Sequence, residues 1–440
     1  MLRNGVTRCR HVYPKLTEKN YFYAHEFSRG PDLMRHYLLL STTCLLAACG
    51  GGGETTISTP PPAANPEATH NFVHPTDPKT YQGIGASHVF EYLTDERDRF
   101  DQQAQTFAGN ASTARDSKIS ITYNPREAVY TLQLRDPLSG AEAQTRFQDP
   151  ASRTDFGGAE EPQWGVREMA NPNINYLQAG DGDPRSPYRL SGSGLVNPGD
   201  NDTAPTGTDG SSYQSTTLFV LEPGSETNYV TYAGYVRNAF NFGTLETEAG
   251  VFDTIIHHLE RGAFAYGERT DNNSVPKTGS GTYSGSMVAS MIFNPTLDDL
   301  NPDGSSGAIS SYFQWIEGTA NLAVNFANST VDLALGGKVY APSYDYYTSP
   351  TDTAIKDQAT FAARGSGTIN MVNFGGFKGE FSSASFTNPN GTQYNVNIAG
   401  SSIDGTFFGP KAEEAGGGFR IVGGNPDERI DILGAFVGKK

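Results

Sequence analysis

Cys49 is the residue whose surroundings most clearly point to a chemical reaction. An apolar run over residues 37–48 ends at this cysteine, and four glycines follow it directly. Arg35 precedes the run, so a basic start, an apolar stretch and small residues come in the order of a secretory signal. The run is too short to cross a bilayer as a helix, which needs about 20 apolar residues. The chemistry that this arrangement predicts is acylation of the Cys49 thiol.

The sequence Leu46-Ala47-Ala48-Cys49 resembles the lipobox of bacterial lipoproteins. The resemblance implies a signal peptide over residues 34–48, cleavage before Cys49, and a palmitate-type acyl chain that attaches the protein to outer-membrane lipid. The alternative is a chance apolar run with a buried free thiol. Cys44 lies inside the run and is expected to be removed with it.

Residues 1–33 are polar, charged and aromatic, and they would move the apolar segment away from the chain start. We interpret them as a misassigned N-terminal extension, with translation beginning at Met34. Residues 49–79 are rich in Gly, Pro, Thr and Ala and contain few large apolar residues. This composition is typical of a disordered Gly/Pro-rich linker.

The charge content argues against a nucleic-acid partner, and the cysteine content argues against internal disulfides. Removing the seven basic and three acidic residues of positions 1–48 from the totals of 32 and 48 leaves 25 basic and 45 acidic residues, a net charge of −20. Such a surface repels phosphate backbones, so no nucleic-acid partner is expected. A chain cut before Cys49 keeps one of its three cysteines and forms no internal disulfide.

Alternating apolar and polar residues predict β-structure from about residue 80 onward. Two hairpins are expected over residues 119–134 and 216–236, whereas residues 149–212 are dense in Gly, Pro, Asp, Asn and Ser and show no sustained period. The sequence therefore predicts a loop-rich, handle-like β domain with a small antiparallel sheet over residues 80–261.

The alternation is cleaner after residue 278. Over residues 281–293, Tyr283, Met287 and Met291 share one face while serines occupy the other. About eight such segments, with glycines at bends and no amphipathic helix, favour an eight-stranded antiparallel β-barrel over residues 262–440. We expect apolar side chains to fill it. Because the opposite faces are rich in Ser, Thr and Asn, and because the chain already has an anchor, a membrane-spanning barrel is not expected. The predicted fold class is all-β.

The C-terminal half resembles the barrel domain of the transferrin-binding protein B family of surface lipoproteins. The sequences that carry the resemblance are GTFFGPKAEEAGGGFRI and the closing GAFVGKK. The motif positions are Gly405, Phe407, Gly409, Pro410, Glu414, Gly417, Phe419, Gly434 and Phe436. The likeness covers residues 262–440 well and residues 80–261 only loosely. The motif positions are interpreted as structural.

The resemblance implies a barrel joined to a handle sheet, displayed on the outer membrane of a Gram-negative cell and used to capture a ligand. Receptors for transferrin itself have two such pairs, and this chain has room for one. Single-lobe relatives bind other partners, including haem and host complement regulators. The expected partners are an iron or haem carrier protein from a host or the environment, and an outer-membrane receptor.

One aromatic cluster is a candidate for contact with a partner. Tyr344, Tyr346 and Tyr347 lie in a loop with Pro and Asp between predicted strands, and clustered exposed tyrosines suit protein interfaces. Packing over the barrel mouth is the alternative. Trp315 is expected to pack in the core or against the handle.

Metal and haem sites find little support in the sequence. His257 and His258 are adjacent, and neighbouring side chains of a strand point to opposite faces. No histidine follows them, so a haem ligand would have to be one of these, His70, His74, His88 or a tyrosine. Residues 299–304 match the first half of a calcium loop, but Ser310 stands where a bidentate Glu is needed. No metal and no cofactor are expected, although haem is a candidate ligand.

The sequence contains no GxSxG, HExxH, Walker A or CxxC pattern, so an enzyme is not expected. The leading hypothesis is a non-catalytic surface lipoprotein that captures a ligand in iron or haem acquisition. The alternatives are a lipocalin-like small-molecule carrier and a structural or adhesive surface lipoprotein.

The proposed start at Met34 can be tested directly. An N-terminal peptide map of the precursor should begin at Met34 and contain no peptide from residues 1–33. Recovery of such a peptide would refute the proposed start.

Overall fold

The computed structural model describes residues 71–95, 104–108, 117–135, 142–148, 166, 168–180, 212–247, 250–294, 312–341, 354–424 and 429–440. All of these residues belong to one compact unit, Asn65–Lys440. Every regular element within these ranges is a β-strand. Among these residues, no helix has the length and hydropathy needed to cross a membrane.

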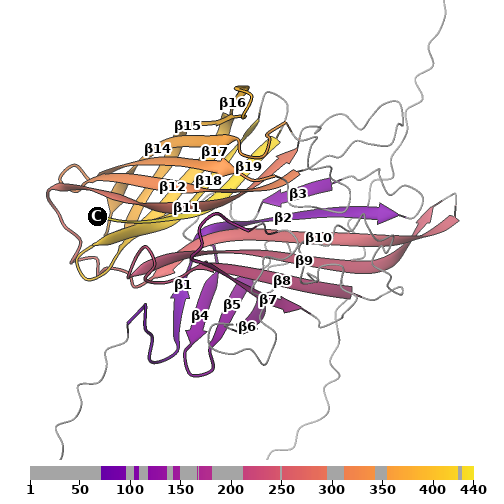
Figure 1. Ribbon diagram of the computed structural model, residues 1–440, viewed down its shortest axis with the longest axis horizontal. Helices are drawn as coiled ribbons and strands as arrows, with labels where there is room; N and C mark the ends of the chain where they lie inside the picture. The colour runs from indigo at the N-terminus through magenta and orange to yellow at the C-terminus, as the bar shows by residue number, and fades with distance from the viewer. Residues whose placement is uncertain are drawn as a thin grey trace, which may run out of the picture. The chain divides into compact units, whose positions relative to one another are not determined.

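The C-terminal strands form a closed antiparallel barrel (Figure 1). Eight strands follow one another in the order β14-β13-β12-β11-β19-β18-β17-β15, and pairing of β14 with β15 closes the ring. Short β16 pairs with the end of β15. The predicted eight-stranded barrel is confirmed. The eight barrel strands are β11 (Ser280–Asn294), β12 (Tyr312–Asn325), β13 (Thr330–Val339), β14 (Thr360–Asn370), β15 (Gly376–Thr387), β17 (Asn397–Phe408), β18 (Glu414–Gly424) and β19 (Arg429–Lys439), and β16 spans Gln393–Asn395.

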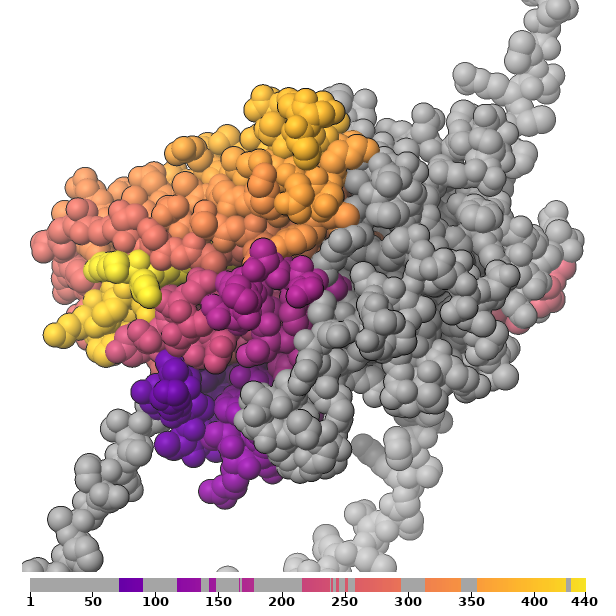
Figure 2. All heavy atoms as spheres, viewed as in Figure 1, coloured from indigo at the N-terminus to yellow at the C-terminus, as the bar shows by residue number. Residues whose placement is uncertain are grey.

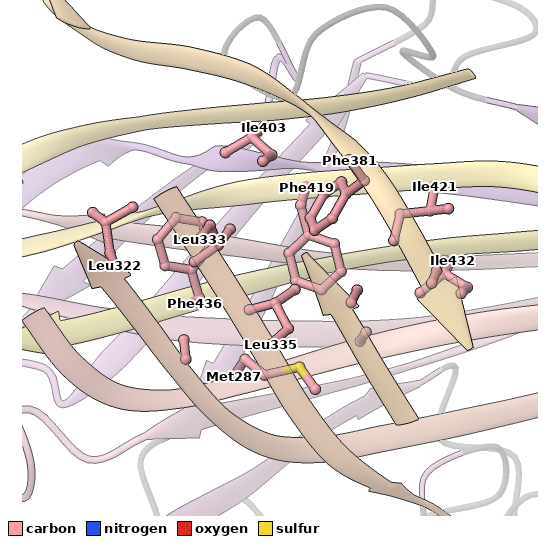
Figure 3. Close-up of a cluster of buried hydrophobic side chains, with 14 of the residues drawn as sticks. Met287, Leu322, Leu333, Leu335, Phe381, Ile403, Phe419, Ile421, Ile432 and Phe436 are labelled. Atoms are coloured by element: carbon pink, nitrogen blue, oxygen red, sulfur yellow. The ribbon is translucent and has the colours of Figure 1, made fainter. Parts of the chain in front are cut away.

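Apolar side chains fill the interior of this barrel, as the alternation predicts. Tyr283, Met287 and Met291 of β11 are all buried in it. Figure 3 shows how aromatic and aliphatic side chains from facing strands meet there, among them Phe381, Phe419 and the other labelled residues. Close packing of this kind makes the barrel a core in its own right.

The chain before the barrel forms two sheets (Figure 1). The larger sheet has the order β3-β2-β10-β9-β8-β7, and the smaller has the order β1-β4-β5-β6. The strands of the larger sheet are β2 (Ile84–Asp95), β3 (Ala104–Ala108), β7 (Ile174–Gly180), β8 (Ser212–Leu221), β9 (Val230–Thr247) and β10 (Gly250–Gly267). Those of the smaller sheet are β1 (Lys79–Gln82), β4 (Ser120–Asn124), β5 (Val129–Arg135) and β6 (Glu142–Gln148). We call the two sheets together the handle.

The two hairpins expected from the alternation are present, as β4–β5 and β8–β9. One strand was missed, because β7 lies within the range predicted as loop. The handle is also larger than the small sheet that the pattern suggested. β10 runs through the predicted boundary between residues 261 and 262, and the barrel strands begin at Ser280.

Two further cores hold these sheets. The first lies between the handle sheets and includes Leu132, Leu218 and Phe264. The second lies between the larger handle sheet and the outside of the barrel, and includes Phe219 and Trp315. The outward face of several barrel strands is therefore covered by the handle and is not exposed to water.

The motif glycine Gly417 provides a test of the barrel wall. A Cβ at this position would lie 2.1 Å from the backbone oxygen of Asp404 on the neighbouring strand, which is closer than atoms can approach. Gly417→Ala should therefore lower the free energy of unfolding by about 1–3 kcal/mol in denaturant titrations. Gly400→Ala is the matched control on β17, since its Cβ would meet nothing within 4 Å. Equal stability of the two variants would contradict this account.

Candidate functional site

The predicted contact and modification residues lie mostly outside the described residues. This holds for the loop of Tyr344, Tyr346 and Tyr347, for Cys49, and for the calcium-like segment 299–304. The tyrosines fall between β13 and β14 in the sequence. Their roles in partner binding and lipidation therefore remain predictions. The described residues do show the surface that joins the handle to the barrel.

The nine motif positions lie on β17, β18, β19 and the turn between β17 and β18. Phe407, Phe419 and Phe436 point into the barrel core. Gly434 leaves room for the Phe419 ring, whose nearest carbon would lie 2.5 Å from a Cβ there. Gly409 adopts a left-handed backbone (φ 84°), which glycine tolerates without strain. The motif therefore shapes one side of the barrel and the turn that leaves it.

Glu414 of this motif binds the handle. Its carboxylate accepts hydrogen bonds from the backbone N–H groups of Asn228 (2.6 Å), Tyr229 (2.7 Å) and Val230 (3.2 Å), at the start of β9. Burial raises the pKa of Glu414, and these hydrogen bonds oppose the increase by favouring the charged form. A carboxylate of the barrel thus satisfies three backbone donors of the handle at once.

Glu317 of β12 makes a second contact of the same type. Its carboxylate accepts hydrogen bonds from the backbone N–H groups of Ala170 (2.6 Å) and Asn171 (2.8 Å), just before β7. The Tyr340 hydroxyl donates to the same carboxylate. The barrel therefore holds the handle through carboxylates on two different strands.

An apolar seam lies between handle and barrel. The indole of Trp315 packs edge-on against the ring of Phe219, with ring centroids 5.0 Å apart and planes at 85°. Trp315 is 1 % exposed. Its position agrees with the packing role expected from the sequence and leaves it unavailable to a partner.

A buried group of charged and polar side chains lies across the same interface. His88 of β2 places its Nε2 3.1 Å from the Ser290 hydroxyl of β11. Arg420 of β18 forms a bidentate pair with Asp431 of β19, at 3.0 and 2.6 Å. The Arg261 guanidinium stacks 3.9 Å from the centre of the Phe313 ring. Burial lowers the pKa of His88 well below its usual value, and Arg420, Arg261 and Arg429 add to the decrease.

The candidate haem histidines that the structure describes lie in different surroundings. His88 is 1 % exposed and lies among arginines, whereas His74 is exposed and His258 is half-buried on β10. His70 and the side chain of His257 lie outside the described residues. Among the described residues, no group of three or more His, Cys, Asp or Glu side chains could hold a metal ion.

The site is thus a hydrogen-bonded junction between two β-structures, and its polar groups orient one part against the other. Sequence reasoning missed Glu317 and named His88 only as a candidate haem ligand, not as part of this buried group. Glu414 was named as a motif position, but its handle partners, some 185 residues away in the sequence, could not be inferred.

Comparison with known proteins identifies the class of the barrel. Residues 275–440 match the family described as the C-lobe and N-lobe β-barrels of Tf-binding protein B. Together with the strand order, this match shows that the C-terminal part of the chain is a transferrin-binding protein B-like β-barrel domain, as the motif indicated. No curated protein matches the chain.

Solved structures of this class also align with the chain. A tryptophan-to-alanine variant of the vaccine antigen transferrin binding protein B from Haemophilus parasuis Hp5 is 14 % identical, with 83 % of this chain and 79 % of that chain covered and a TM-score of 0.25. Intact Ap-TbpB, with N and C lobes, is 11 % identical, with 83 % and 80 % covered and a TM-score of 0.26. The assignment of the barrel rests on the family match and the strand order.

The buried histidine predicts a pH effect on stability. The pKa of His88 is lower in the folded than in the unfolded chain. As the pH falls below the unfolded pKa of about 6.5, the unfolded chain therefore binds a proton that the folded chain does not, and the free energy of unfolding decreases. The free energy of unfolding should decrease by about 1.4 kcal/mol per pH unit over this range.

His88→Gln should remove this part of the pH dependence in denaturant titrations between pH 7 and 5. His74→Gln, at an exposed position, is the control and should keep it. A pH profile unchanged by His88→Gln would contradict the assignment.

Proposed function

We propose that the protein is a non-catalytic lipoprotein of the outer-membrane surface that captures an iron or haem carrier protein. The observation that carries the proposal is the transferrin-binding protein B-like barrel over residues 275–440. The Cys49 lipobox supports a lipid anchor on the same chain. An outer-membrane receptor that takes over the cargo is the further partner that this role requires.

The packing of the barrel supports capture by outer surfaces. Its interior holds apolar side chains from all of its eight principal strands, so a lipocalin-like carrier with its ligand inside the barrel is disfavoured. On the face shown in Figure 2, the orange and yellow barrel strands form a continuous surface of closely packed atoms. A partner would therefore bind to loops and outer faces, and the loop of Tyr344, Tyr346 and Tyr347 is the proposed contact.

Display on the cell surface can be tested with the full chain in intact cells. Added protease should degrade the wild-type protein, and labelled palmitate should be incorporated into it. Cys49→Ser should lose the label and become protected, whereas Cys44→Ser should behave as wild type because that residue leaves with the signal peptide. Protection of the wild-type protein until the outer membrane is broken would refute surface display.

Capture can be tested on the same cells. Cells grown without iron should retain one saturable partner from host fluids, with haem followed by its absorbance. Replacing Tyr344, Tyr346 and Tyr347 by Ala should reduce this retention at least tenfold, as expected for an aromatic interface centre. Recovery of no iron or haem carrier would refute the iron assignment and leave a structural or adhesive role.

A further inference from the structure

A cavity of about 830 Å³ lies in the handle, and none of its lining residues belongs to a barrel strand. Its floor is apolar, with Ile121 of the smaller sheet facing Leu177 and Val220 of the larger one. All three are at most 2 % exposed. Segment 72–76, which precedes β1, forms one rim. The volume falls within the usual range for small-molecule sites, which are concave and mostly apolar.

Aromatic rings make up much of the wall. Phe72, Tyr81 and Tyr266 form one group, with ring centroids 5.3 to 6.0 Å apart. Tyr123 and Tyr130 form a second group at 4.5 Å. The strand register explains the second group, because Tyr123 of β4 lies directly opposite Tyr130 of β5.

The charges along the wall favour a cation. Lys79 donates to both carboxylate oxygens of Glu268 at 2.6 Å, so its charge is compensated. The Tyr81 hydroxyl donates to the same carboxylate at 2.8 Å. Glu222 also lines the cavity, and within the described part of the chain it forms no ion pair. One lining carboxylate, on an exposed residue, is therefore left without an ion pair beside several aromatic rings, and the faces of such rings attract cations.

Tyr266 adds a second, independent observation. This side chain lines the cavity and is 4 % exposed, and its hydroxyl has no hydrogen-bond partner among the described residues. A buried hydroxyl without a partner is unfavourable. A ligand in the cavity could supply the missing partner.

We propose that this handle cavity binds a small organic cation with a flat apolar body. The apolar body lies on the floor among the rings, the cationic nitrogen is balanced by Glu222, and the Tyr266 hydroxyl bonds to the ligand. The lining residues all lie between Phe72 and Tyr266 in the sequence and none is part of the proposed capture loop, so this proposal stands or falls independently of the proposed function.

The test uses three probes of one shape and different charge, with the full chain in calorimetric titrations. The probes are 2-naphthylmethylammonium, 2-naphthylmethanol and 2-naphthoate. The cation should bind about tenfold more tightly than the alcohol, and the anion more weakly than both. Equal binding of all three, or binding of none, would overturn the proposal.

Variants then locate the site. Glu222→Gln should remove most of the tenfold preference for the cation and leave binding of the alcohol unchanged. Glu127→Gln is the matched control, because that carboxylate pairs with Arg146 outside the cavity. Tyr266→Phe should weaken binding of the probe several-fold while leaving the folded state at least as stable. Retention of the cation preference in Glu222→Gln would overturn the assignment.

Blocking the cavity gives a further check. Asn175 is exposed at its rim, so Asn175→Trp should abolish binding of every probe. Gln133→Trp is the control, since Gln133 is exposed on β5 and does not line the cavity. Thermal unfolding verifies that both variants fold. Unchanged binding in a folded Asn175→Trp protein would overturn the proposal, and the Glu222→Gln comparison remains decisive if Asn175→Trp does not fold.

Discussion

The handle is held on the barrel by carboxylates of the barrel that accept hydrogen bonds from backbone N–H groups of the handle. A buried carboxylate without hydrogen bonds is strongly unfavourable. Glu414 and Glu317 avoid this cost only while the start of β9 and the segment before β7 stay in place. Since these contacts come from β18 and β12, they hold the handle at two separate points. The orientation of the handle on the barrel is thus fixed by charge-assisted hydrogen bonds as well as by apolar area.

The apolar seam between these contacts shows that both faces of the barrel wall are packed against other side chains. One face fills the barrel interior, and the other packs Trp315 and its neighbours against the handle. With the interior filled and part of the outside covered, the proposed capture of a partner would depend on loops and on the remaining outer faces. The handle cavity is different, because it lies between two sheets that are not joined edge to edge.

The barrel could be predicted because its strands keep a clear period of two. Tyr283, Met287 and Met291 all point inward, and the glycine-rich motif marks its closing strands. The handle gave a weaker pattern because both faces of its larger sheet are covered, so polar and apolar positions no longer alternate. In β10, the adjacent residues Glu260 and Arg261 are both fully buried or nearly so, and Glu260 forms an ion pair with Arg237. A charged pair in sequence normally indicates an exposed segment.

The candidate site was less predictable for a related reason. Glu414 is visible in the sequence as a motif residue, yet its function depends on backbone groups far away in the chain. The residues next to Glu317 and His88 in the sequence do not indicate their roles, because their hydrogen-bond partners come close only when the sheets are assembled. The handle cavity has the same origin, since its rings come from β1, β4, β5 and β10 and from the segment before β1.

The pairing of β11 with β19 has a consequence for how the chain folds. Ser284 lies opposite Lys439, so the barrel cannot complete its ring until strands more than 130 residues apart have met. The handle has a similar requirement, since β2 pairs with β10. Contacts between such distant segments slow folding, because loop-closure entropy opposes them. Neither the barrel nor the larger handle sheet can therefore form until nearly all of its strands are available to pair.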